Sequence, residues 1–506
     1  MSLSVAYTRA AIGIQAPQVC VEVHLSSGLP ALSMVGLPET AVREARDRVR
    51  SAIINCGFSF PAKRITVNLA PADLPKEGGR FDLPIAVAIL AASEQIPAEK
   101  LTQYEFLGEL ALTGALRGVQ AVIPAAIAAQ GAGRQLILSA ENIAEVGLIE
   151  HGDNLVARDL LEICAFLQGD VQLERAHVKH DDLPTVEGDL QEVIGQQQAR
   201  RALEIAAAGG HNLLLIGPPG TGKTMLATRL NSLMPPLTDQ EALESACIAS
   251  LVRSDGMQTH WRQRPFRAPH HSASLFALVG GGALPKPGEI SLAHNGVLFL
   301  DELPEFERRA LDALREPLES GEIGISRARA KVIYPARFQL IAAMNPSPTG
   351  HYHGPHNRCS PQQTLRYLNR LSGPFLDRFD LSLEVPLLPT GTLSAQRSDG
   401  ESSATVRQRV VVARERQLAR VGKVNALMSN NEIKDCCMLK NEDAGWLEQV
   451  LTQLGLSVRA WQRILKVART IADLAGDNEI NREHLTEAVS YRGMDRLLIH
   501  LQKNLE

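Results

Sequence analysis

Aromatic side chains are scarce in this sequence, where Phe, Trp and Tyr together make up 4% of 506 residues. Proteins that bind single-stranded nucleic acid on an aromatic platform, such as OB-folds, stack successive bases on exposed rings. The shortage of rings therefore argues against that class of protein.

Cysteine is also sparse, and none of the seven cysteines belongs to a Cys-x-x-Cys pair. An odd number of scattered thiols is typical of a reducing cytosol rather than of a disulfide framework. No secretory signal is visible, because no sustained apolar segment follows Arg9. The longest apolar run, residues 83–92, contains Pro84 and is too short to cross a bilayer. We therefore expect a cytoplasmic protein with no membrane partner.

An excess of positive charge is missing as well. The chain has 52 Lys and Arg against 56 Asp and Glu, which gives a net charge of −4. Binding to nucleic acid would therefore need a local basic surface, such as a pore or a loop.

The chain does contain ample apolar material, 45% of its residues, in a length that requires several domains. Residues 1–170 mix short apolar strands with helices, as in an α+β layer domain. Residues 189–388 form a second block. Residues 406–506 are helical by pattern, most clearly over 458–474, where apolar residues recur at helical spacing.

Two polar segments separate these blocks. Residues 389–405 are rich in Ser, Gly, Thr and Pro and are expected to be a linker. Residues 171–188 are charged and polar, which fits a linker or a surface loop within one domain. In the first block, strands are expected at 18–25, 31–35 and 65–69, and helices at 39–54 and 81–92.

A phosphate-binding loop follows the strand expected at 213–216. Its Gly-x-x-x-x-Gly-Lys-Thr pattern consists of Gly217, Pro218, Pro219, Gly220, Thr221, Gly222, Lys223 and Thr224. Glycines let backbone amides approach phosphate oxygens, and the following helix N-terminus adds partial positive charge. We expect ATP and Mg²⁺ as cofactors, with Lys223 on the β and γ phosphates and the Thr224 hydroxyl on the metal.

Two acids end a second apolar strand, residues 297–300. Carboxylates at the carboxyl end of a parallel strand lie at the ligand crevice of an open α/β sheet. We expect Asp301 to hold the Mg²⁺ shell and Glu302 to act as the general base. Acids that merely cap a strand are the alternative.

Three further polar residues complete the expected hydrolytic set. Asn345 follows a third strand, 338–343, and is the candidate γ-phosphate sensor; a turn-forming Asn before Pro is the alternative. Arg378 is the candidate arginine finger of a neighbouring subunit, unless it pairs with Asp377 or Asp380. Arg459, at the start of the 458–474 helix, is a candidate second sensor or a surface arginine.

Apolar residues before the helix expected at 199–208 are the candidate adenine contacts. They are Val193 and Ile194, and the signal is weak by itself.

At this point the residues resemble a known family. The run Pro-Phe-Arg-Ala-Pro-His-His at 265–271, Gly280–Gly282, the stretch 287–296 and the acids at 301–302 resemble the magnesium-chelatase ATPases, most closely their bacterial ComM (YifB) branch. The pieces 343–346, 371–374 and 467–474 support the resemblance, which covers nearly the whole chain. It implies an α/β AAA+ P-loop core with a parallel sheet, an N-terminal domain like that of Lon (ribosomal protein S5 domain 2-like), a C-terminal helical lid and a homo-hexameric ring.

The resemblance also implies a function. Proteins of this branch are understood as ATP-dependent DNA helicases that drive branch migration in natural transformation, acting on single-stranded and branched DNA. The alternative is a chelatase-like or chaperone-like remodeller that hydrolyses ATP without helicase activity.

The family places two insertions in the core, which match a basic, glycine-punctuated segment and a hairpin. The hairpin, 324–334, carries Arg327, Arg329 and Lys331 at alternate positions, so a strand would present all three on one face. They are candidate DNA contacts, with a solvated basic edge strand as the alternative. The first insertion, 254–287, adds three further candidates: Arg262, Arg264 and Arg267.

Two departures from the family pattern matter. Arg80 and Ile123 stand where the Lon-like serine and lysine would be, so we expect no peptidase activity. A cysteine-rich loop of relatives is reduced here to Cys359, accompanied by His351, His353 and His356. These four have donor types suited to zinc, but a histidine-rich surface loop is favoured.

Overall fold

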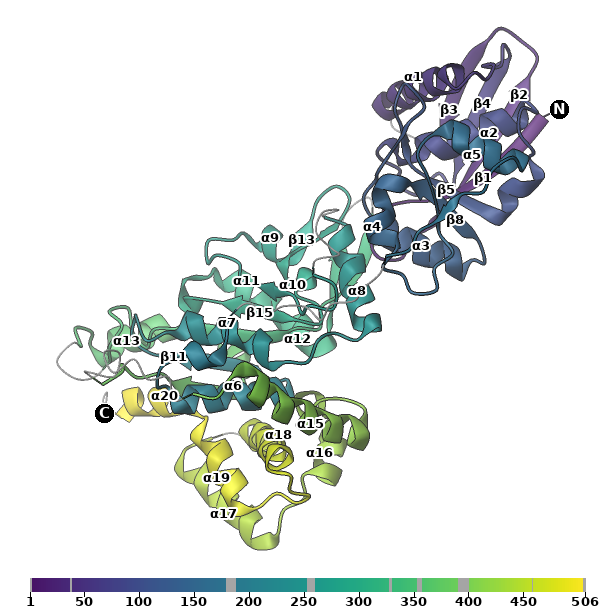
Figure 1. Cartoon of the computed structure of the whole chain (residues 1–506). Helices are drawn as coiled ribbons and strands as arrows, with labels where there is room; N and C mark the ends of the chain where they lie inside the picture. The colour runs from purple at the N-terminus through teal and green to yellow at the C-terminus, as the bar shows by residue number, and fades with distance from the viewer. Residues whose placement is uncertain are drawn as a thin grey trace.

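The computed structural model describes residues 2–36, 39–178, 188–252, 260–326, 330–352, 357–389, 400–456 and 458–503. Three regions follow one another along the chain (Figure 1). An N-terminal α/β domain is joined to a central α/β core, and a group of helices lies against the other side of that core (Figure 1). The expected α/β class is confirmed.

The N-terminal domain is built on a mixed eight-stranded sheet of order β10-β9-β8-β5-β1-β2-β4-β3. Its strands are β1 (Ser2–Arg9), β2 (Gln18–Ser26), β3 (Ala31–Val35), β4 (Arg64–Ala70), β5 (Tyr104–Leu107), β8 (Gln135–Ser139), β9 (Leu155–Ala157) and β10 (Glu174–Arg175). Its main helices are α1 (Glu39–Asn55), α2 (Asp82–Ala92), α3 (Val122–Gly131) and α5 (Leu160–Gln168). Every residue of α2 is buried, because the helix is apolar on all faces after Asp82 and contacts both the sheet and α1.

The segment expected to start a linker at 171 still belongs to this domain. β10 pairs with β9 as the edge of the sheet, and Leu173 and Ala176 are buried. Part of the expected linker, residues 179–187, lies outside the described residues.

The core has a five-stranded, fully parallel sheet of order β12-β15-β18-β11-β19. The strands are β11 (Leu213–Ile216), β12 (Phe266–Arg267), β15 (Val297–Leu300), β18 (Gln339–Met344) and β19 (Leu381–Glu384). β11, β15 and β18 are buried along their length, as expected of a parallel sheet covered on both faces. Ile216 pairs with both Met344 and Glu384, so the carboxyl ends of these strands meet at one edge.

Two small hairpins extend from the core. One pairs β13 (Gly280–Gly281) with β14 (Lys286–Pro287), and the other pairs β16 (Glu322–Ser326) with β17 (Lys331–Pro335). The Tyr334 hydroxyl donates to Pro285 O at 2.6 Å, which ties the hairpins together. The second hairpin also touches the N-terminal domain, since a Cβ on Gly13 would lie 2.6 Å from Val332 Cγ1.

The C-terminal helices are α15 (Ser403–Val421), α16 (Asn430–Cys436), α17 (Asn441–Gln453), α18 (Val458–Ala475), α19 (Arg482–Ser490) and α20 (Gly493–Lys503). α15 and α18 pack on α6 (Gln197–Gly209), and α15 also contacts α7 (Lys223–Leu233). α20 leaves this group and packs on α13 (Pro361–Leu368) and β19. The last helix is therefore a part of the core rather than of the expected lid. In the part of the chain that the structure describes, no helix is long and apolar enough to cross a membrane.

Candidate active site

The phosphate-binding loop joins β11 to α7 at the carboxyl edge of the sheet. Gly220 and Gly222 have φ values of +77° and +84°, which other residues rarely adopt. A Cβ on Gly217 would lie 2.3 Å from Val385 O, so this glycine is required by close backbone packing. The three glycines of the motif therefore each meet a local requirement of the loop.

Lys223 begins α7 and turns its ammonium group back over the loop. Nζ donates to Gly217 O and Pro218 O, both at 2.8 Å, and to Asn345 Oδ1 at 3.2 Å. Burial lowers the pKa of Lys223, while the charge of Asp301 opposes that shift. The expected phosphate-binding lysine and the expected sensor amide thus meet at one point.

Thr224 and Asp301 provide oxygen donors side by side. The Thr224 hydroxyl donates to Asp301 Oδ2 at 2.6 Å, although the two residues come from different elements. Hydroxyl and carboxylate oxygens are the ligands that Mg²⁺ accepts in nucleotide sites. This pair therefore fits the expected metal position.

Glu302 lies directly after Asp301 with a left-handed φ of +52° and a side chain that is 59% exposed. His271 Nδ1 lies 3.0 Å from Glu302 Oε2. In the sequence, His271 was noted only as a member of a family motif, and no role was predicted for it. Its position after β12, the neighbour of β15 in the sheet, was the available signal.

The segment before α6 also reaches the loop. Gln196 Nε2 donates to Pro386 O at 2.8 Å and to Thr221 O at 3.4 Å. Val193 is buried in the core next to it, and Ile194 is partly buried. Gln196, which has a φ of +51°, was missed at the sequence level.

Arg378 and Arg459 lie away from this loop, at the amino edge of the sheet. Arg378 precedes β19, and its carbonyl accepts from Asn212 Nδ2 at 2.9 Å, immediately before β11. The guanidinium of Arg378 pairs with Glu319 rather than with Asp377 or Asp380. Arg459 lies 3.5 Å from Asp377 Oδ2 and is 75% exposed.

These two arginines line a common cationic pocket of about 510 Å³. Its lining residues are Arg315, Glu319, Pro374, Asp377, Arg378, Arg459, Gln462, Arg463 and Lys466. Burial, followed by the charges of Arg315, Arg459 and Arg463, lowers the pKa of Arg378. The pocket is thus electropositive and suited to an anion.

The candidate DNA contacts have different surroundings. Arg264 is mostly buried and donates to Pro235 O and Asn295 O, and Arg267 forms two bonds to Glu289 at 2.6 and 2.7 Å. Arg262 donates to Leu237 O at 3.0 Å. Because these guanidinium groups serve contacts inside the chain, the geometry gives their DNA role no support.

The basic hairpin is described only in part. Lys331 is the exposed first residue of β17 and pairs with Ser326. Arg327 and Arg329 lie outside the described residues, so the expected row of three cations stays a prediction.

The first departure from the family pattern falls in buried surroundings. Arg80 is 5% exposed and donates to Gln120 O at 3.3 Å, and Ile123 is buried in α3. His353 and His356 lie outside the described residues. Among the residues that are described, no three His, Cys, Asp or Glu side chains form a metal-binding group.

Comparisons with known proteins cover the whole chain. Three family models match: "Magnesium chelatase, subunit ChlI" over residues 189–393, "Subunit ChlI of Mg-chelatase" over 21–142, and "Magnesium chelatase, subunit ChlI C-terminal" over 400–492. The uncharacterized protein YifB of Salmonella typhimurium is 67% identical over 505 residues, which is 100% of both chains.

Two other relatives carry more informative names. Competence protein ComM of Haemophilus influenzae is 62% identical over 503 residues, 98% of this chain and 99% of the relative. The magnesium-chelatase 38 kDa subunit of Rhodobacter capsulatus is 26% identical over 344 residues, 59% of this chain and 86% of the relative. With its phosphate loop, its paired acids and full-length relatives of this similarity, the chain belongs to the ComM/YifB family of magnesium-chelatase-type AAA+ proteins.

Proposed function

We propose that this protein is an ATP-driven DNA motor that moves branched junctions during recombination, as a ring of identical subunits. The observation that carries the proposal is the meeting of Lys223, Thr224, Asp301 and Asn345 at one edge of the sheet. That set binds a triphosphate and positions its γ-phosphate in P-loop enzymes.

Within this site each residue has a distinct task. Lys223 would bind the β and γ phosphates, and Asn345 would orient the γ-phosphate and the attacking water. Thr224 and Asp301 would hold Mg²⁺, which neutralises phosphate charge when bound. Glu302 accepts the proton of the attacking water.

Hydrolysis also needs a cation near the transferred phosphate, and the fold favours one from another subunit. β11 and β19 run parallel, and four residues of strand span roughly 13 Å. The phosphate loop follows β11, whereas Arg378 precedes β19, so the two lie at opposite edges of the same sheet. We therefore propose that the pocket of Arg378 and Arg459 faces the nucleotide of a neighbouring subunit, in a head-to-tail ring that closes as a hexamer.

DNA contact is assigned to the β16–β17 hairpin. Lys331 is exposed there, and the sequence places Arg327 and Arg329 next to it. Cations that neutralise phosphates bind without sequence preference and in a salt-dependent way. The name of the Haemophilus relative, a competence protein, agrees with a role in DNA handling.

The test is ATP turnover measured with single-stranded, duplex and branched DNA, together with movement of a labelled four-way junction. We expect branched DNA to stimulate turnover and the junction to move only with ATP. Intact turnover with no response to any DNA would contradict the DNA motor and favour a chelatase-like or chaperone-like remodeller.

The Lys331→Ala variant assigns the DNA contact to the hairpin. It should weaken DNA stimulation several-fold and reduce the salt dependence of DNA binding by about one phosphate contact. Lys440→Ala is the matched control, since Lys440 is also exposed but lies in the helical domain. Equal losses of DNA stimulation in both variants would contradict the proposal that the hairpin contacts DNA.

A further inference from the structure

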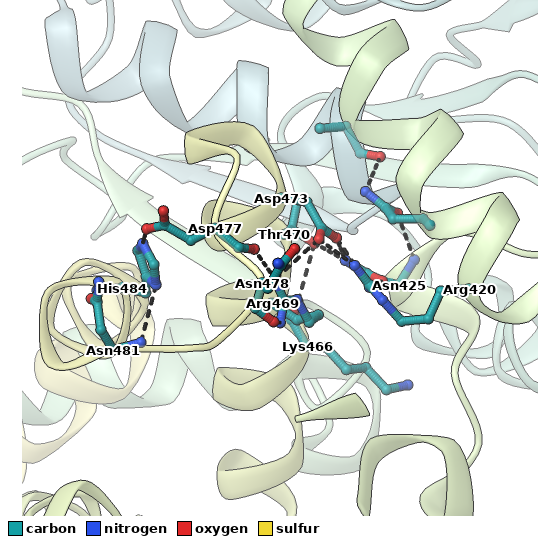
Figure 2. A network of polar contacts seen from close by, with 12 residues as sticks. Arg420, Asn425, Lys466, Arg469, Thr470, Asp473, Asp477, Asn478, Asn481 and His484 are labelled. Carbon is teal, nitrogen blue, oxygen red and sulfur yellow. Dashed lines mark hydrogen bonds and ion pairs between the residues drawn. The ribbon is translucent and has the colours of Figure 1, made fainter. Parts of the chain in front are cut away.

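The run at 467–474, which supports the family resemblance, carries three polar side chains that the nucleotide site does not use. Arg469, Thr470 and Asp473 are all buried on α18. Asp473 accepts from Asn425 Nδ2 at 2.9 Å and from Arg420, and it forms an ion pair with Arg469 Nη2 at 3.2 Å (Figure 2). The carboxylate therefore joins α15, the 425–427 turn and α18 into one unit.

Thr470 connects this unit to the AAA+ core. Its Oγ1 accepts from Asn425 Nδ2 at 3.0 Å and lies 2.7 Å from Nε2 of the buried His211 (Figure 2 shows Thr470 and Asn425). His211 Nδ1 in turn lies 3.2 Å from Asp380 Oδ2. Burial of Asp380 raises its pKa, but the bond from His211 and nearby cations outweigh burial and lower the pKa overall. Because Asp380 stays ionised, Nδ1 of His211 is the donor to it.

Asp380 lies two residues after Arg378, and the other side of Arg378 is held from the same helix. Arg463, only 8% exposed, donates to Asp377 O and Asp377 Oδ1, both at 2.9 Å, and to Phe379 O at 3.4 Å. Arg463 and Thr470 are seven residues apart, so they lie on one face of α18. That face fixes the backbone on both sides of Arg378.

We propose that Thr470, through His211 and Asp380, and Arg463 are positioning residues that couple the helical domain to Arg378. A rotation of α18 against the core then moves the finger that serves the neighbouring subunit. The inference rests on the proposed role of Arg378, and it adds that the finger is aimed by the helical domain of its own chain.

The test compares Thr470→Val with Thr470→Ser in the full-length protein. Valine keeps the shape but loses the hydroxyl, whereas serine keeps the hydroxyl. We expect Thr470→Val to lower kcat by about tenfold to a hundredfold, the cost of a small misplacement of a catalytic group. The KM for ATP should stay unchanged, because the phosphate loop lies at the other edge of the sheet. Thr470→Ser should match the wild type.

A subunit-mixing measurement separates aiming from loss of structure. Thr470→Val subunits have an intact phosphate loop, so their turnover should recover when Lys223→Ala subunits supply an intact finger. A general folding defect would not recover. If Thr470→Val folds poorly, Arg463→Lys keeps the charge but cannot reach both carbonyls, and the same pattern is expected of it.

Different results would contradict the positioning role of Thr470 and Arg463 and the proposed role of Arg378. Wild-type kcat in Thr470→Val and Arg463→Lys, a raised KM, or no recovery on mixing would overturn this inference while Arg378→Ala stays inactive. Full turnover in Arg378→Ala would instead contradict the proposed role of Arg378 as an arginine finger.

Discussion

At the scale of single residues, the phosphate site consists of four polar side chains that meet at the carboxyl edge of the core sheet. Lys223, Thr224, Asp301 and Asn345 were expected from their positions after apolar strands, and the structure brings them together. His271 was not expected to have a role, because its contact with Glu302 depends on how a loop folds across the sheet edge. Local patterns identify groups that end strands, but not groups delivered by loops.

In the proposed mechanism, hydrolysis depends on Glu302, whereas nucleotide binding does not. Glu302→Gln keeps an acceptor for His271 but cannot take a proton from water. We predict normal ATP binding and a fall in kcat of at least about a hundredfold, measured by single-turnover hydrolysis and nucleotide titration.

A matched control is available nearby. Glu305→Gln makes the same change at an exposed acid that pairs with Arg370 at 3.1 Å. It should leave kcat unchanged. Equal effects of the two substitutions would show that local charge, and not proton transfer, controls turnover.

At the scale of elements, the three core strands expected at 213–216, 297–300 and 338–343 start and end within one residue of expectation. Residues 213–216 form β11 as expected, and the expected helix at 458–474 is α18. These elements are predictable because their apolar spacing is regular. The start of the first linker, expected at 171, was placed too early, since the polar β10 is held by pairing with β9 and has no apolar pattern of its own.

One contact between elements links the N-terminal domain to the β16–β17 hairpin. Gly13 has a φ of +58°, and a Cβ there would lie 2.6 Å from Val332 Cγ1. Gly13→Ala should therefore cost about 1–2 kcal/mol for the left-handed backbone and about 1–3 kcal/mol more for the overlap with Val332. The measurement is urea unfolding followed by a probe in each domain.

Gly57→Ala measures the backbone part of that cost alone, so the difference between the two variants gives the cost of the overlap with Val332. Gly57 has a φ of +81° with no other atom within 4 Å of its Cβ position, so only the backbone term applies there. A loss of stability no greater in Gly13→Ala than in Gly57→Ala would mean that the N-terminal domain does not hold the hairpin tightly.

At the scale of the whole molecule, the parallel sheet separates the two halves of the proposed hydrolytic set. The phosphate loop lies at the carboxyl ends of the strands, and the cationic pocket lies at the amino ends. The sequence predicts both sets of residues but not their separation, which depends on the order of the strands and on the packing of α18. The packing of α20 on the core could not be predicted either, because the sequence of an amphipathic helix does not indicate which surface it covers.

The most direct test of the account mixes Arg378→Ala subunits with Lys223→Ala subunits and measures ATP turnover. Each variant alone should be inactive, because Arg378→Ala subunits lack the finger and Lys223→Ala subunits cannot bind the nucleotide. In an equimolar random ring one interface in four joins an intact phosphate loop to an intact finger, so about one quarter of wild-type turnover should return. Turnover no greater than that of the separate variants would contradict a site shared between subunits.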